Sequence, residues 1–261
     1  MATSGIPSAR RKLARAQMHA DALRIEVDAF RERSPYVFDT SASQKICGTR
    51  DVEIVCKVAA APTIPDSWAL ITGDVLTNAN AALDHAIYQH VREQNPSIPP
   101  HRIQYPILDD PQEFAARTSG RFGAEVLSLI EDAQPFHWSN PAAHPLRMLR
   151  KLANIDKHRE LVVASYVMDA FVVGASELYQ VVSTDVLREN GMGVGAVVAR
   201  ARLRVAEHAA PRHYLDVAIT PKYGESIEVP GIDQGVDLVV AIDRVIGRMG
   251  PYLDALEAAG C

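Results

Sequence analysis

A long stretch without Lys, Arg or Glu, from residue 58 to residue 91, constrains this chain most. Within it, residues 67–91 have the length and apolar period of an α-helix. At about 100° per residue, one arc of this helix holds Trp68, Val75, Ala79, Ala82, Leu83 and Ala86. The opposite arc is small and polar, without the charges that normally coat an exposed helix. We therefore predict a helix that is buried on its apolar face.

The polar arc of this helix carries Asp74, Asn78, Ala81 and His85 in one stripe, flanked by Thr77, Asn80, Asp84 and Tyr88. These polar types either fill a buried hydrogen-bond network or line a site in which His85 is an acid, a base or a ligand. Solvent exposure is a third alternative, although an exposed face of this length normally holds Lys or Glu. The small residues would also let another helix come close, which is compatible with a homodimer.

A second predicted helix opens at Asn140-Pro141, runs to about Glu160 and is basic along one side. The spacing of 3, 4, 3 and 4 places one stripe on His144, Arg147, Lys151, Asn154 and His158. The stripe is either the solvated face of the helix or an anion-binding surface opposite the first helix. Asp156 falls on the apolar side, where an acid is expected to have a partner such as Arg159.

The rest of the chain reads as helix, strands, helices, strands and helix, which predicts an α+β fold with a helical bundle and an antiparallel sheet. We predict one domain over 1–261, with the helical motif region at 67–160 and C-terminal strands and a helix at 161–261. The predicted strands are 36–38, 52–58, 161–174, 194–206 and 214–220. The further predicted helices are 8–33, 111–118, 121–132 and 232–258, the last bent or broken at Pro251.

Composition excludes several classes of protein. The formal net charge of −5 argues against a sequence-independent nucleic-acid binder. No run of about 18 apolar residues and no secretory signal occurs, so we expect a protein outside the membrane. The three cysteines have no Cys-x-x-Cys spacing, which favours a reducing cytoplasm over a disulfide framework or a structural zinc site. Phosphate-binding loops, dinucleotide fingerprints and nucleophile elbows are absent.

The two predicted helices together resemble a widespread family of uncharacterised bacterial proteins. The family pattern is Gly-Asp-x-x-His-Asn-x-Arg-Ser-Ala-Leu-Asp-His, then a Phe-Pro-Ile-like stretch, then Leu-x-x-Leu-x-x-Ile-Asp-Lys-His-Arg. The first part is matched by Gly73, Asp74, Asn78, Ala82, Leu83, Asp84 and His85. The later parts are matched by Tyr105-Pro106-Ile107 and by Leu149, Leu152, Ile155, Asp156, Lys157, His158 and Arg159. The resemblance covers roughly residues 67–160.

The Arg-x4-His of that family pattern is similar to the motif of HEPN-like domains, helical bundles that often act as metal-independent ribonucleases. This chain has Thr77 and Asn80 where the pattern has His and Arg. The resemblance implies an endoribonuclease or an RNA-binding protein without a cofactor, in which His85 and His158, with Asp84, carry acid–base chemistry. RNA or a phosphate-bearing small molecule would then bind to Asn78, Asn80, Arg147, Lys151, Asn154, Lys157 and Arg159.

Two other functions remain open from the residues alone. One is a metal- or small-molecule-dependent enzyme whose site lies between the two helices, with Asp74, Asp84, His85 and His158 as ligands of a divalent metal ion. The other is a non-catalytic ligand-binding or scaffold protein, in which the polar stripes are interior networks.

Overall fold

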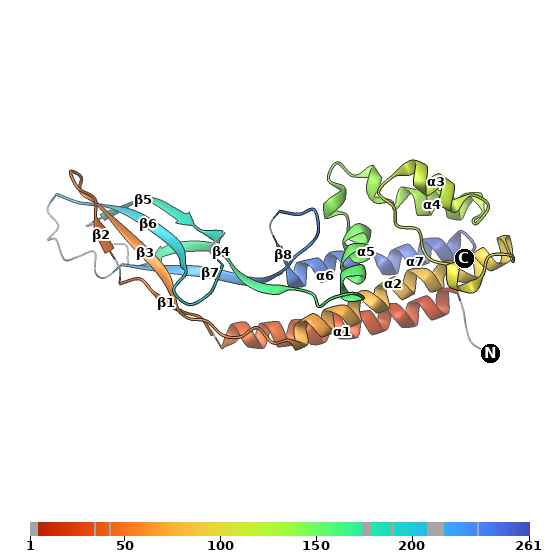
Figure 1. Cartoon of the computed structure of the whole chain (residues 1–261), viewed down its shortest axis with the longest axis horizontal. Coiled ribbons are helices and arrows are strands. Elements are labelled where there is room, and N and C mark those ends of the chain that lie inside the picture. The colour runs from red at the N-terminus through yellow and green to blue at the C-terminus, as the bar shows by residue number, and fades with distance from the viewer. Residues whose placement is uncertain are drawn as a thin grey trace. The chain divides into compact units, whose positions relative to one another are not determined.

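The computed structural model describes residues 5–33, 35–41, 43–173, 179–188, 191–207, 217–233 and 235–261. It confirms the predicted α+β class, with helices and antiparallel strands in separate parts of the chain (Figure 1). Two compact units arise, a helical one from Met1–Glu26, Asp66–Val163 and Ile227–Cys261, and a sheet-rich one from Val27–Pro65 and Ala164–Ser226. The single domain predicted over 1–261 stays a prediction.

The helical unit is formed by seven α-helices among the described residues, the first of which continues into the sheet-rich unit. These are α1 (Ile6–Glu32), α2 (Ser67–Gln94), α3 (Pro111–Thr118), α4 (Ala124–Asp132), α5 (Pro145–Asp156), α6 (Leu238–Ile246) and α7 (Met249–Ala258). Short 3-10 turns occupy Pro100–Arg102, Pro135–His137 and Pro141–Ala143, and the two-residue strand β8 (Val236–Asp237) precedes α6. No helix in these ranges is long and apolar enough to cross a bilayer.

Helices α1 and α2 lie antiparallel, each with an apolar face in the core. Along α1 the apolar residues at helical spacing are all buried, namely Leu13, Ala16, Ala20, Leu23, Val27 and Phe30. At one end of the pair Ser8 of α1 hydrogen-bonds to His85 of α2 (2.8 Å). At the other end the Trp68 indole N–H donates to Glu26 of α1 (3.1 Å). The predicted apolar arc of α2 is buried as well, so the charge gap does mark a core helix.

The predicted helix 232–258 is divided at a place other than Pro251. Helix α6 ends at Ile246 and α7 begins at Met249, so the break falls at Gly247 and Arg248. Pro251 lies within the first turn of α7, where the missing proline N–H costs nothing because such groups have no partner inside a helix. Asp237 caps α6 by accepting from the Val240 N–H (3.0 Å), which explains why residues 232–237 stay outside the helix.

Helix α5 is shorter than the predicted range of 141–160. Residues 141–143 form a 3-10 turn, and the helix begins at Pro145, because a proline disfavours helical backbone in the residue before it. His144 is the N-cap, and its Nδ1 accepts from the Leu146 N–H (3.2 Å). The helix ends at Asp156, so His158 and Arg159 lie beyond it.

The sheet-rich unit has one sheet in the order β1 (Val37–Asp39), β3 (Asp51–Ala60), β6 (Val197–Val205) and β5 (Tyr179–Val186). The short strand β2 (Ser43–Lys45) also pairs with β3, and β4 (Val163–Val173) pairs with β7 (Ala218–Ile227). The pairs of the first sheet are antiparallel, as predicted. Strands β2 and β5 were not predicted. Of the predicted strand 214–220, residues 218–220 belong to β7, and residues 214–216 lie outside the described part of the chain.

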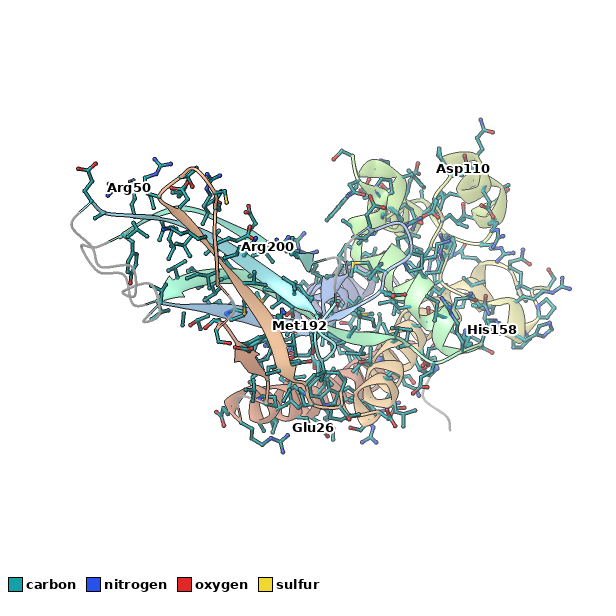
Figure 2. The ribbon with its side chains drawn as sticks, turned by 60° about the vertical axis from the view of Figure 1, so that its left-hand side comes forward. Glu26, Arg50, Asp110, His158, Met192 and Arg200 are labelled. Carbon is teal, nitrogen blue, oxygen red and sulfur yellow. The ribbon has the colours of Figure 1, made fainter. Side chains whose placement is uncertain are left out.

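One face of the β3–β6 strand pair carries alternating arginines. Arg202 and Arg204 of β6 both donate to Asp51 of β3, at 2.7 and 3.0 Å, and Arg200 donates to Glu53 at 3.0 Å. We call this group of five residues the arginine ladder. Figure 2 labels Arg200 on this strand. Each arginine of the ladder therefore has a carboxylate partner.

Candidate functional site

A hollow of about 580 Å³ in the helical unit is lined by five basic side chains. Its walls are α2, the extended segment after α2, the end of α3 with the turn that follows, and one side of α5. We call it the arginine pocket. Its lining residues are Asn80, Asp84, His101, Arg102, Gln104, Tyr105, Pro106, Ile107, Leu108, Arg117, Arg121, Phe122, Arg150, Ala153, Asn154 and Lys157.

Five lining residues are Lys or Arg and only one, Asp84, is acidic, in a chain whose net charge is −5. Within the described part of the chain, Arg102, Arg121 and Lys157 have no ion pair. Arg117 pairs with Glu113 of the same helix (2.7 Å), an exposed pair that solvent weakens. The pocket therefore concentrates positive charge, which attracts anions by direct Coulomb interaction.

Arg150 is held in place at the pocket wall by two acceptors. Its guanidinium donates to the backbone oxygen of Ile107 and to the carboxylate of Asp109. Asp109 also accepts from Arg147 (3.1 Å), which in turn donates to the backbone oxygen of Pro230 (3.1 Å). A side chain fixed by several hydrogen bonds loses little further freedom when it binds a ligand, so Arg150 is preorganised.

Asp84 fastens the extended wall of the pocket to α2. One of its oxygens accepts from the Tyr105 N–H (2.7 Å) and the other from the Asn80 amide (3.3 Å). Burial raises the pKa of the Asp84 carboxyl, and the Tyr105 N–H and the nearby Lys157 partly offset that rise. Asp84 thus contributes a hydrogen-bonded acid whose charge is disfavoured, beside five cations.

The same wall is fixed from its other side by Gln134, which is fully buried. The Gln134 amide donates to the backbone oxygen of Pro106 (2.9 Å), and its carbonyl oxygen accepts from the Leu108 N–H (2.9 Å). The segment 105–108 is held by side chains, because no neighbouring strand pairs with it in the described residues. This arrangement explains how a loop forms a defined wall.

Helix α2 presents its two sets of polar residues to different surroundings. Asn80 and Asp84, which flank the predicted stripe, line the arginine pocket. The stripe residues His85 and Asn78 face α1, where Ser8 bonds to His85 and Lys12 donates to Asn78 at 3.5 Å. Burial, together with the cations Lys12 and Arg11, lowers the pKa of His85. His85 is thus placed in the interhelical packing of α1 and α2.

Of the basic stripe predicted on the second helix, only Asn154 lines the arginine pocket. Asn154 and Lys157 line the pocket, together with Arg150 and Ala153, which are not on that stripe. Arg147 and Lys151 are not among the lining residues, and His158 is exposed beyond the helix end (Figure 2). Arg159 lines a separate hollow of about 390 Å³ formed with residues 228–233 and Gly235. His85 and His158 do not meet at the arginine pocket.

The alternative metal ligands do not gather into a site within the described residues, where no group of three His, Cys, Asp or Glu side chains is placed to hold a metal ion. Asp74 is exposed and lies 4.0 Å from His19 of α1. Asp84 is at the arginine pocket, His85 faces α1 and His158 follows α5. Each of the four therefore has different surroundings.

Asp156 packs against α2 at Gly73. A Cβ atom on Gly73 would lie 2.7 Å from Oδ2 of Asp156, so a glycine is needed where the two helices cross. Burial and the neighbouring Asp74 raise the pKa of Asp156. The expected partner, Arg159, makes no ion pair with it in the described residues. Asp156 is instead a half-buried acid that approaches another acid.

Several lining residues were not predicted, namely His101, Arg102, Arg117, Arg121 and Arg150. Arg117 lies near the end of α3 and Arg121 in the turn that follows it, so no single predicted helix connected them. His101 and Arg102 come from the loop after α2. Arg150 lies on α5, and the helical period alone did not determine which side of that helix faces the pocket. No protein-family model, curated protein or solved structure matches this chain, so its site must be interpreted from its own residues.

Proposed function

We propose that this protein binds a small phosphate-bearing molecule in the arginine pocket. The observation that carries the proposal is the set of three cations without ion pairs, Arg102, Arg121 and Lys157, around one hollow of about 580 Å³. Like charges held together repel each other, and a bound anion relieves that repulsion. Guanidinium groups match the geometry of phosphate oxygens, which favours phosphate over a less symmetric anion.

The size and the remaining polar groups of the pocket also fit a small molecule. Ligand sites for small molecules commonly enclose about 300–1,000 Å³. The amides of Asn80, Gln104 and Asn154 add donors and acceptors suited to hydroxyl groups beside a phosphate. The single carboxylate, Asp84, is already hydrogen-bonded to the Tyr105 N–H and to the Asn80 amide. Together these groups support a phosphate ester rather than free inorganic phosphate.

Calorimetric titration with pyrophosphate and with ribose 5-phosphate tests this proposal. We expect saturable binding, and a loss of about tenfold in Arg121→Gln, since a hydrogen bond to a charged group contributes about 1.5–3 kcal/mol. Arg200→Gln is the matched control, because it removes the same charge from the arginine ladder. An absence of saturable binding, or equal affinity in the two variants, would refute the proposal.

A second candidate function is metal-independent RNA cleavage, which the presence of His101 in the arginine pocket favours. His101 would then move protons at the ribose hydroxyl, the role the sequence assigned to His85 and His158, while the arginines hold the phosphate. Cleavage of a single-stranded RNA in EDTA tests it. We expect His101→Ala to abolish cleavage and His85→Ala to retain it. Intact RNA with the wild-type protein would exclude this candidate.

The predicted homodimer and cytoplasmic location remain proposals. The close helix neighbour expected along the polar face of α2 is α1 of the same chain, so a homodimer would need another surface. Light scattering coupled to gel filtration measures the assembly directly. All three cysteines are free thiols, which is compatible with the reducing compartment that we propose. Burial raises the pKa of the Cys56 thiol to about 11.

A further inference from the structure

A second site is suggested by an exposed tryptophan in the helical unit. Trp138 keeps 46% of its surface exposed, although its ring packs edge-on against His144 with 4.7 Å between ring centroids. Two adjoining hollows, of about 590 and 230 Å³, share Trp138, Pro145, Arg244 and Arg248 as lining residues. We call this continuous depression the Trp138 groove. It has no lining residue in common with the arginine pocket.

The smaller hollow of the Trp138 groove has an apolar floor. Leu83, Leu146, Val245 and Met249 line it, and each is at least nine-tenths buried. A cavity of about 150 Å³ lined by such side chains binds benzene. The 230 Å³ hollow is therefore large enough for one aromatic ring, with the face of Trp138 available beside it.

Positive charge lies at the junction of the two hollows. Arg244 and Arg248 line both, and neither makes an ion pair within the described ranges of the chain. Two acids are also present. Asp243 pairs with Arg24 of α1, and Asp132 lines only the smaller hollow, beside Tyr252. An anionic group at the junction would therefore contact both arginines, while Asp243, which lines the larger hollow, is already paired with Arg24.

His144 adds a donor of defined tautomer. Its Nδ1 accepts from the Leu146 N–H, which leaves the proton on Nε2 in the neutral ring. Burial lowers the pKa of His144, so the neutral form is favoured. The groove therefore combines an apolar floor, an aromatic face, one neutral donor and two arginines.

We propose that the Trp138 groove binds a small aromatic carboxylate, with the ring on the apolar floor and the carboxylate on Arg244 and Arg248. Charge complementarity selects the anion, and the small hollow selects a single ring. This site is independent of the phosphate site, and neither proposal depends on the other.

Titration with 3-phenylpropanoate tests the proposal, with the uncharged 3-phenylpropanamide as the matched ligand. The chain has two tryptophans and the other, Trp68, is fully buried, so Trp138 fluorescence reports binding and Trp138→Phe should abolish the signal. We expect saturable binding of the acid by calorimetry and at least tenfold weaker binding of the amide. The double variant Arg244→Gln/Arg248→Gln should weaken the acid at least tenfold and leave the amide unchanged.

Controls keep the test decisive. Arg15→Gln removes an exposed arginine of α1 outside the groove and should bind the acid as the wild type does. Arg248→Lys keeps the positive charge and should bind 3-phenylpropanoate with an affinity between those of the wild type and the double variant. It keeps the test usable if the double variant has a lowered melting temperature. The proposal fails if the acid does not saturate, if the amide binds equally well, or if 2-phenylethylamine binds more tightly than the acid, which would make Asp132 the dominant group.

Discussion

The arginine ladder and the arginine pocket contain the same residue type in opposite electrostatic settings. In the ladder, Asp51 accepts from both Arg202 and Arg204, and the hydrogen bond from Arg204 is the largest of the effects that lower the pKa of that carboxyl. In the pocket, Asp84 accepts from an amide and a backbone N–H, and burial raises its pKa. The ladder therefore neutralises its charges internally, while the pocket retains unpaired positive charge.

We infer from this difference that pairing, rather than the number of arginines, distinguishes the proposed anion site from the ladder. The alternation of Arg200, Arg202 and Arg204 is the clearest basic pattern in the sequence, yet each has a carboxylate across the strand pair. The cations of the pocket come from separate segments and form no such pattern. An anion is attracted more strongly by unpaired cations, because no neighbouring carboxylate offsets their positive charge.

Removal of three cations from each region should give the largest contrast. The triple variant Arg102→Gln/Arg121→Gln/Lys157→Gln should weaken pyrophosphate binding about a thousandfold, since each charge-assisted hydrogen bond contributes about 1.5–3 kcal/mol. The triple variant Arg200→Gln/Arg202→Gln/Arg204→Gln makes the same charge change and should bind within about twofold of the wild type. Calorimetry in one buffer compares them. Equal losses would mean that the overall charge, not the pocket, determines affinity.

Asp84 should be more important as an acceptor than as a charge. Asp84→Ala leaves the Tyr105 N–H without its acceptor and should lower the free energy of unfolding by about 1–3 kcal/mol. Asp84→Asn keeps a carbonyl oxygen at that position and should cost far less, while it removes a negative charge that opposes the ligand. Urea unfolding measures the first effect and pyrophosphate titration the second. If Asn costs as much as Ala, the charge itself is what stabilises the wall.

The main helices and their buried faces could be predicted from the sequence, because helical period and burial are local properties. The apolar residues of α1 at helical spacing and the apolar arc of α2 are both buried. The division of 232–258 was misplaced, since Pro251 is tolerated in the first turn of α7. Strand β5 was missed although Val181 and Val182 are β-branched, because the exposure of both breaks the alternation expected of a half-buried strand.

The site was only partly predictable. Asn80, Asp84, Asn154 and Lys157 lie at the arginine pocket, as expected for a site between the two helices. His85 and His158 do not lie there, because α5 ends at Asp156 and α1 covers the stripe of α2. The remaining cations come from the loop and short helices between α2 and α5. Their positions depend on tertiary anchors, such as Gln134 and Asp109, that no local pattern reveals.

Asp51 should make the arginine ladder sensitive to acid. Because its folded-state pKa is lowered, its stabilising effect is complete above its unfolded pKa of about 3.9 and is lost as the pH falls through the folded value. Asp51→Asn should therefore lower the melting temperature at pH 7 and flatten the acid side of the stability profile. Thermal melts between pH 2 and 7 follow both. An unchanged profile would show that the ladder is an exposed set of pairs without influence on stability.

Asp156 should show the reverse pH dependence, with the smallest effect. Its raised pKa means that the free energy of unfolding falls as the pH rises from about 3.9 through the folded value, because the charged form is disfavoured beside Asp74. Asp156→Asn should match the wild type below about pH 4 and be more stable at pH 7 by less than about 1 kcal/mol. Asp28→Asn, at an exposed position of α1, is the control and should have no effect. A less stable Asp156→Asn at pH 7 would mean that this carboxylate has a stabilising partner at the crossing of α2 and α5, which would place it with Asp51 rather than with Asp84.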